Sequence, residues 1–191
     1  MTQEKPNLPS DLSHDPAQLV LRFKDPTYGA VRLKDVFLFT RFTEAELIPL
    51  YRLGRLVRLK AKAHAVIEGE PTRGFYILLH GRVSVYKTDP VTGGMVRLAI
   101  LEEGANFGEL SLFDNAPRSA TVVAETGCYL FQLDFDAFSG FLAQATDDLR
   151  LRFYQTCVEE LAVRFRLLNG DYINSQQLLW KYALRKEGKA S

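Results

Sequence analysis

Several kinds of residue are scarce in this chain of 191 residues, and each shortage excludes something. The only two cysteines, Cys128 and Cys157, stand far apart without the C-x-x-C spacing of a redox or zinc motif, so we expect two buried free thiols. The three histidines are scattered, with no thiol or carboxylate companions at ligand spacing. We therefore predict no metal site.

An excess of charge of either sign is also missing, because 24 lysines and arginines balance 23 acidic residues. A dedicated nucleic-acid-binding protein normally presents a basic surface to phosphates, so this balance argues mildly against that class. No apolar run approaches the length of a membrane span, and the N-terminus has no apolar signal-peptide core. We expect a cytoplasmic protein without a membrane partner.

What the chain does contain predicts an α+β fold. Prolines among polar residues predict an irregular N-terminal arm over residues 1–34. A helix is expected next, with Thr43 as its N-cap and Glu46 completing a capping box. Pro49 falls late in that helix, so we expect a kink or a short first segment.

From residue 56 to residue 133 the pattern is typical of strands. Six short runs rich in β-branched and aromatic residues are separated by turns rich in Gly, Pro and Asp. The runs are 56–59, 75–79, 83–86, 95–100, 121–123 and 129–133. Many short strands without long helices between them predict an antiparallel β-roll, a jelly-roll-like barrel.

Helical periodicity returns after Asp134. A short helix is expected first, and then a long one from about Asp147 to Leu168, ending at Asn169-Gly170. The tail, 169–191, is expected to hold one further short helix. The long helix spaces its apolar residues for packing on its own barrel or for a two-fold homodimer interface: Leu151, Tyr154, Val158, Leu161, Phe165 and Leu168.

Residues 107–122 carry the side chains best suited to binding an anion. Gly108 permits close approach of the backbone, and a helical turn starting at Glu109 would aim backbone N–H groups at a phosphate. Arg118 supplies a planar, permanently charged donor, and Ser119 adds a hydroxyl. A carboxylate at Glu109 is odd beside an anion, but it would suit a sugar hydroxyl. Each of these signals is weak alone, and their arrangement is more specific.

In order and spacing these residues resemble the phosphate-binding cassette of the cyclic-nucleotide-binding domain family. That family includes catabolite-activator-type regulators, regulatory subunits of cyclic-nucleotide-dependent kinases and cyclic-nucleotide-gated channels. Its motif F-G-E-[LI]-x-L, followed by P-R-x-A-T-V, is matched without a gap by Phe107 to Val122. Upstream, 37–39, 68–71, 75–78 and 81–86 also agree, so the resemblance covers roughly residues 35–168, which we expect to form one domain.

The resemblance implies a site for a cyclic purine nucleotide and no other cofactor. Glu109 would hold the ribose 2′-hydroxyl, Arg118 would pair with the cyclic phosphate, and Ser119 would assist. The complete predicted site is Phe107, Gly108, Glu109, Leu110, Ser111, Arg118, Ser119 and Ala120. We favour cAMP slightly over cGMP, because it is the commoner ligand of bacterial-type members. One departure from the family is that 60–64 lacks the glycine that usually opens the second strand.

We expect a stand-alone cyclic-nucleotide sensor that signals to an unidentified effector protein by a conformational change. The alternative is an interaction scaffold that kept the fold and no longer binds nucleotide. A DNA partner is not expected, because 169–191 is too short for a winged helix-turn-helix. An enzyme is disfavoured, because Glu109, Asp114 and Asp136 offer no acid/base pair beside a nucleophile.

Overall fold

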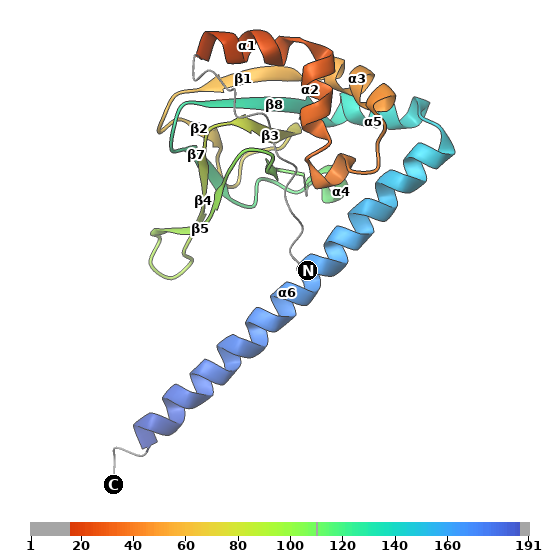
Figure 1. The fold of residues 1–191 in the computed structure, drawn as a ribbon. Coiled ribbons are helices and arrows are strands. Elements are labelled where there is room, and N and C mark those ends of the chain that lie inside the picture. Colours follow the sequence, from red (N-terminus) through yellow and green to blue (C-terminus); the bar gives the residue numbers. More distant parts are fainter. Residues whose placement is uncertain (1–15, 110, 188–191) are drawn as a thin grey trace, which may run out of the picture. The chain divides into compact units, whose positions relative to one another are not determined.

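The computed structural model describes residues 16–109 and 111–187 (Figure 1). The chain divides into two units, Met1–Gln144 and Ala145–Ser191. The first unit contains the strands, which form an antiparallel β-roll with helices on its N-terminal side, as the sequence predicts. The second unit contains one long helix.

The chain before the roll is helical. Its elements are α1 (Pro16–Lys24), α2 (Pro26–Leu33), the 3₁₀ turn η1 (Phe37–Phe39) and α3 (Glu44–Leu53). The prediction of an irregular arm is therefore wrong for residues 16–33, and residues 1–15 lie outside the described part. Asp25 caps α2 by accepting the Thr27 N–H at 2.9 Å. Pro26 occupies the first turn, where its missing N–H costs no helical hydrogen bond.

The predicted capping box of α3 is confirmed. Thr43 Oγ1 accepts the Glu46 N–H at 3.3 Å, and the Glu46 carboxylate accepts the Thr43 N–H at 2.7 Å. The helix continues through Pro49 to Leu53, so the expected short first segment is wrong. A Cβ on Gly29 would meet the Tyr51 ring at 2.0 Å, which explains why α2 needs a glycine where it packs on α3.

Eight strands form two antiparallel sheets of four. The strands are β1 (Arg55–Leu59), β2 (His64–Val66), β3 (Gly74–His80), β4 (Val83–Thr88), β5 (Met95–Leu101), β6 (Asn106–Phe107), β7 (Thr121–Ala124) and β8 (Cys128–Asp134). Their orders are β1-β8-β3-β6 and β2-β7-β4-β5. The six predicted strands are confirmed. β2 and β6 were not predicted, because runs of three and two residues are too short to show an alternating pattern.

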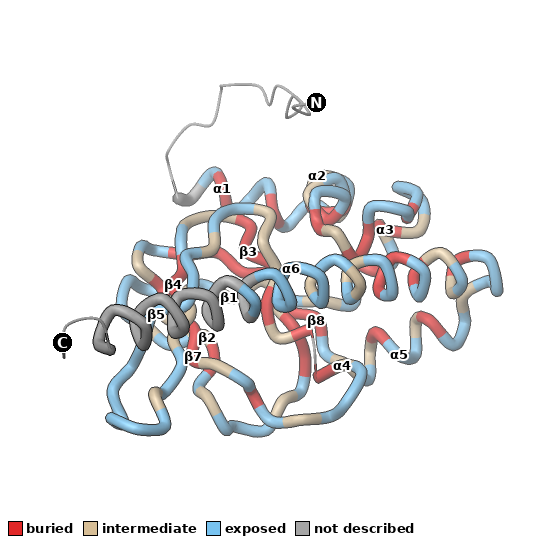
Figure 2. Tube along the Cα trace, turned by 90° about the horizontal axis from the view of Figure 1, so that it is seen from below, coloured by how far each residue is buried: buried red, intermediate tan, exposed pale blue. Residues whose placement is uncertain are grey.

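The faces of β3 point into two different cores. Leu78 belongs to the cluster inside the roll, together with Val66, Val83, Phe107, Val122, Ala124, Cys128 and Leu130. On the opposite face Phe75 packs against Phe39 of η1 and Phe138 of α5 (Phe135–Gln144), with ring centroids 6.2 and 5.7 Å apart. Figure 2 shows the buried positions following the strands of the roll. The first sheet is therefore covered by helices on its outer face and fixed on both sides.

The turn at 60–64, where the expected glycine is missing, contains a lysine in the left-handed region. Lys62 has φ of 69°, and its N–H donates to the Ala124 carbonyl at 2.6 Å. The Ala124 N–H donates in return to the Ala63 carbonyl at 2.9 Å. A non-glycine residue in this conformation costs about 1–2 kcal/mol, and these two bonds to β7 offset that cost.

In the second unit, α6 (Asp147–Glu187) is a single helix. The predictions that a helix ends at Asn169-Gly170 and that a separate one follows are wrong. A Cβ on Gly170 would meet nothing within 4 Å, and one exposed glycine costs a helix only about 1 kcal/mol. The six apolar residues of the predicted stripe are exposed, by 50% at Leu161 to 66% at Leu168. The homodimer remains a prediction.

Both cysteines are buried free thiols, as predicted, and burial raises the pKa of Cys157 to about 11. Within residues 16–109 and 111–187, no three His, Cys, Asp or Glu side chains are grouped to hold a metal ion. In the same part of the chain, none of the helices combines the length and the apolar character needed to cross a bilayer.

Candidate anion-binding site

The segment that follows β6 turns sharply at a glycine. Gly108 has φ of 81°, a conformation that strains any residue with a Cβ. A Cβ at this position would also meet Nη1 of Arg118 at 2.1 Å. Gly108 is therefore required twice, once by its own backbone and once by the guanidinium that lies against it.

Arg118 is the most unusual side chain of this segment, because it is a cation and only 8% exposed. Its Nη2 donates to the Gly74 carbonyl at 2.7 Å, and its Nη1 donates to the Gly108 carbonyl at 3.2 Å. Its Cζ lies 5.6 Å from the centroid of the Tyr76 ring. A guanidinium carries five N–H donors, so the bonds to described residues leave three for another acceptor.

The charge of Arg118 is not neutralised at short range. Among the described residues, no carboxylate lies within the 4.0 Å that an ion pair with Arg118 requires. Burial lowers its pKa, and Tyr76, Glu109 and Glu70 act from longer range in the opposite direction. Buried charges in proteins are normally paired, because leaving water costs several kcal/mol. The arrangement is suited to an anion that supplies the missing charge.

Backbone hydrogen bonds hold Arg118 in place from the other side. The Arg118 N–H donates to the Glu70 carbonyl, and the Gly69 N–H donates to the Arg118 carbonyl, both at 2.9 Å. One residue further on, the Lys87 ammonium donates to the Ser119 carbonyl at 2.7 Å and pairs with Glu68 at 2.5 Å. The loop at 68–70 and strand β4 thus fix the backbone that carries the guanidinium.

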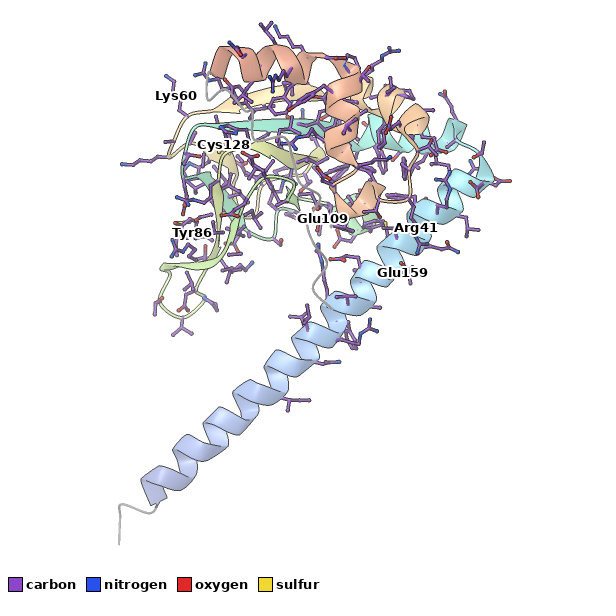
Figure 3. All side chains as sticks on the ribbon, in the orientation of Figure 1. Arg41, Lys60, Tyr86, Glu109, Cys128 and Glu159 are labelled. Carbon is purple, nitrogen blue, oxygen red and sulfur yellow. The ribbon has the colours of Figure 1, made fainter. Side chains whose placement is uncertain are left out.

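Glu109, labelled in Figure 3, is buried, with 6% of its surface exposed. Its carbonyl accepts the Leu112 N–H at 3.0 Å, and the short helix α4 (Ser111–Asp114) follows. The sequence predicts a helical turn starting at Glu109, and the described helix starts at Ser111.

The other predicted site residues lie in different environments. Phe107 and Ser111 are buried, Ala120 is half-buried and Ser119 is exposed. Leu110 lies outside the described residues. The structure thus brings Phe107, Gly108 and Arg118 into one cluster, and places the Ser119 side chain at its exposed margin.

Three neighbours of Arg118 and Ser119 were missed by the sequence analysis. Gly74 supplies a carbonyl, Tyr76 supplies a ring face, and Lys87 bonds the Ser119 carbonyl. The agreement of 75–78 with the family was visible in the sequence, but it gave no reason to connect β3 with Arg118. That connection depends on pairing between strands that are about 30 residues apart in the chain.

Comparisons with known proteins identify a family for the β-roll. Residues 56–145 match the model of a family described as the cyclic nucleotide-binding domain. Over 121 residues the chain is 39% identical to the cAMP-dependent protein kinase regulatory subunit of Neurospora crassa, covering 58% of this chain and 31% of that protein. The chain therefore spans about a third of the length of the curated relatives it matches.

Solved structures share the fold. The sensor domain of the transcriptional regulator DNR from Pseudomonas aeruginosa is 25% identical, with a TM-score of 0.63 over 73% of this chain and 89% of that chain. The regulatory domain of Toxoplasma gondii PKA with cAMP is 27% identical, with a TM-score of 0.55 over 66% of this chain and 45% of that chain. The matched family is a ligand-binding and not a catalytic one.

Proposed function

Residues 56–145 of this chain belong to the cyclic nucleotide-binding domain family, and from that premise we propose that the β-roll binds a cyclic purine nucleotide at Arg118. The observation that carries the proposal is a buried guanidinium with no carboxylate partner among the described residues and three N–H donors left over. A cyclic phosphate supplies one negative charge and acceptor oxygens for those donors.

The remaining roles follow the same chemistry. The Glu109 carboxylate accepts the ribose 2′-hydroxyl, since a carboxylate cannot bond an unprotonated phosphate. Backbone N–H groups at 109–111 and the Ser119 hydroxyl complete the contacts to the phosphate. Phe107 and Ala120 shape the walls of the site. The exposed position of Ser119 suits an assisting role at the margin.

We favour cAMP as the natural ligand. Curated relatives of this chain are described as cAMP-dependent protein kinase regulatory subunits, and one solved relative is described as a complex with cAMP. cGMP is the comparison ligand, because the motif at 107–122 matches the family without identifying the base.

The proposed role is that of a sensor. Binding of the nucleotide shifts the protein between two states, and a separate effector protein reads the difference. The exposed apolar stripe of α6, Leu151 to Leu168, is available either to a second copy or to that effector. We keep the homodimer as part of this proposal.

The test is a calorimetric titration of the purified chain with cAMP and with cGMP. We expect a dissociation constant in the micromolar range or below for at least one of them, together with a rise in melting temperature at saturation. If neither nucleotide binds at millimolar concentration, the sensor is wrong and an interaction scaffold with this fold takes its place.

A further inference from the structure

We infer that Tyr76 is a positioning residue for the anion site and acts through Arg118. This inference rests on the proposed function and concerns a residue outside the segment at 107–122. Tyr76 lies on β3, two residues after Gly74, whose carbonyl accepts the Arg118 Nη2. One short stretch of β3 therefore supplies both a hydrogen-bond acceptor and a ring face to the same guanidinium.

The position of the Tyr76 ring is itself fixed by the sheet. Tyr76 and Phe107 are direct cross-strand partners of β3 and β6, and their rings stack with centroids 5.2 Å apart and an interplanar angle of 16°. Cross-strand aromatic pairs hold each other's orientation on the sheet. The Gly108 carbonyl that accepts the Arg118 Nη1 follows directly after Phe107. The two rings and the two carbonyls thus form one support that is complete without a ligand.

The geometry around Arg118 explains why a support is needed. An arginine side chain loses considerable rotamer freedom when it is ordered, and a free side chain would have to lose it when the anion binds. Two carbonyls fix the guanidinium in its plane, and the Tyr76 ring restricts it from one face. The aromatic face is also favourable to a cation that has left water. Tyr76 thus prepares the three remaining N–H donors for the phosphate.

The structure offers a matched control for this role. Arg58 lies over the ring of Tyr129 with its Cζ 5.8 Å from the centroid, a pair of the same kind. Tyr129 is aligned with His80, at the opposite end of β3 from Gly74. With a rise of about 3.3 Å per residue, the seven residues of β3 separate the two ends by about 20 Å. Replacing Tyr129 removes an aromatic ring from the roll but leaves the surroundings of Arg118 intact.

The experiment measures cAMP and cGMP affinity by calorimetry in four full-length proteins: wild type, Tyr76→Leu, Tyr76→Phe and Tyr129→Leu. We expect Tyr76→Leu to weaken binding roughly tenfold, the size of a desolvated cation–π contact. Tyr76→Phe keeps the ring, and its affinity should stay within about twofold of wild type. Tyr129→Leu keeps wild-type affinity, although it lowers the melting temperature at least as much as Tyr76→Leu.

Two results would overturn the inference. One is unchanged affinity in Tyr76→Leu, and the other is an equal loss in Tyr129→Leu, which would mean that affinity merely follows stability. Should Tyr76→Leu fail to fold, Tyr76→Phe still tests the inference, because it keeps the ring face and a loss of affinity in this variant would overturn the inference as well. A wild-type protein that binds neither nucleotide refutes the proposed function instead, so the two failures are distinguishable.

Discussion

The arginines near the two ends of strand β3 differ in how their positive charge is neutralised. Near His80, Arg82 pairs with Glu125 at 2.8 Å, and the His80 Nδ1 lies 2.7 Å from a Glu103 oxygen. Arg97 and Arg32 add further ion pairs with the same two carboxylates, at 3.7 and 3.6 Å. Near Gly74, the Arg118 guanidinium donates to two neutral carbonyls and reaches no carboxylate of the described residues at ion-pair distance.

Burial makes this difference meaningful. The side chains of the ion pairs near His80 are partly exposed. Because water solvates these charges, they would be stable even without a partner. Arg118 is buried, and a buried charge is destabilising unless an opposite charge lies beside it. The fold thus pairs the partly exposed charges near His80, where pairing contributes little to stability. It leaves the buried Arg118 charge without a carboxylate among the described residues, where pairing would contribute most, and such an arrangement is typical of a binding site.

The largest effect on nucleotide affinity is expected from removing the buried charge of Arg118. Arg118→Ala should weaken cAMP binding by roughly 100-fold or more, because it removes a charge-assisted contact to a desolvated phosphate. Arg82→Ala is the matched control, since it removes an arginine whose charge is already paired, and its affinity should equal that of wild type. Calorimetry checks both variants, and equal losses in the two would break the comparison.

Glu109 gives a smaller effect that depends on the ligand. Glu109→Gln should weaken cAMP binding about tenfold, because an amide is a weaker acceptor than a carboxylate for the ribose hydroxyl. The 2′-deoxy analogue lacks that hydroxyl and should bind both proteins with similar affinity. Paired titrations with the two nucleotides measure the difference. A loss of the same size for both would give Glu109 a structural role.

Glu68, on the loop beside Arg118, links the stability of this end to pH. The Lys87 hydrogen bond, with further bonds from Thr88, lowers the pKa of Glu68 from 4.5 to about 2. A lowered pKa in the folded state stabilises the protein above pH 4.5, and this contribution disappears as the pH falls from 4.5 towards 2. Thermal melts should therefore show Glu68→Gln below wild type at pH 7, with the gap closing by about pH 2–3.

Glu102→Gln controls for the loss of one exposed carboxylate in these melts. A constant gap in melting temperature between wild type and Glu68→Gln over the whole pH range would show that the difference comes from changed hydrogen bonds at this position and not from ionisation.

The smallest effect is expected near His80. Glu125 pairs with Arg82, and the Ser84 hydroxyl donates to it, which lowers the pKa of Glu125. Glu125→Gln should reduce the melting temperature by only a few degrees, because ion pairs in contact with water contribute little. Its cAMP affinity should be unchanged. A clear loss of affinity in this variant would show that the two ends of β3 are coupled.

The fold was predictable where local chemistry decides the outcome. The capping box of Thr43 and Glu46 formed as expected, because its hydrogen bonds involve only neighbouring residues. The prediction of an irregular arm was wrong because proline breaks a helix only in its interior. Pro16 and Pro26 each occupy the first residue of a helix, where proline is favourable. The end expected at Gly170 was wrong because one exposed glycine costs less than the turns on either side contribute.

The sequence by itself determined which residues carry the proposed chemistry, because Gly108, Glu109 and Arg118 stand at motif spacing on one short segment. Only the tertiary structure decided the state of the Arg118 charge. Its carbonyl partners and its aromatic neighbour come from β3 and β6, which pair across the sheet. Burial, and the absence of a carboxylate partner among the described residues, depend on how distant segments pack together, and no pattern within a single segment encodes that.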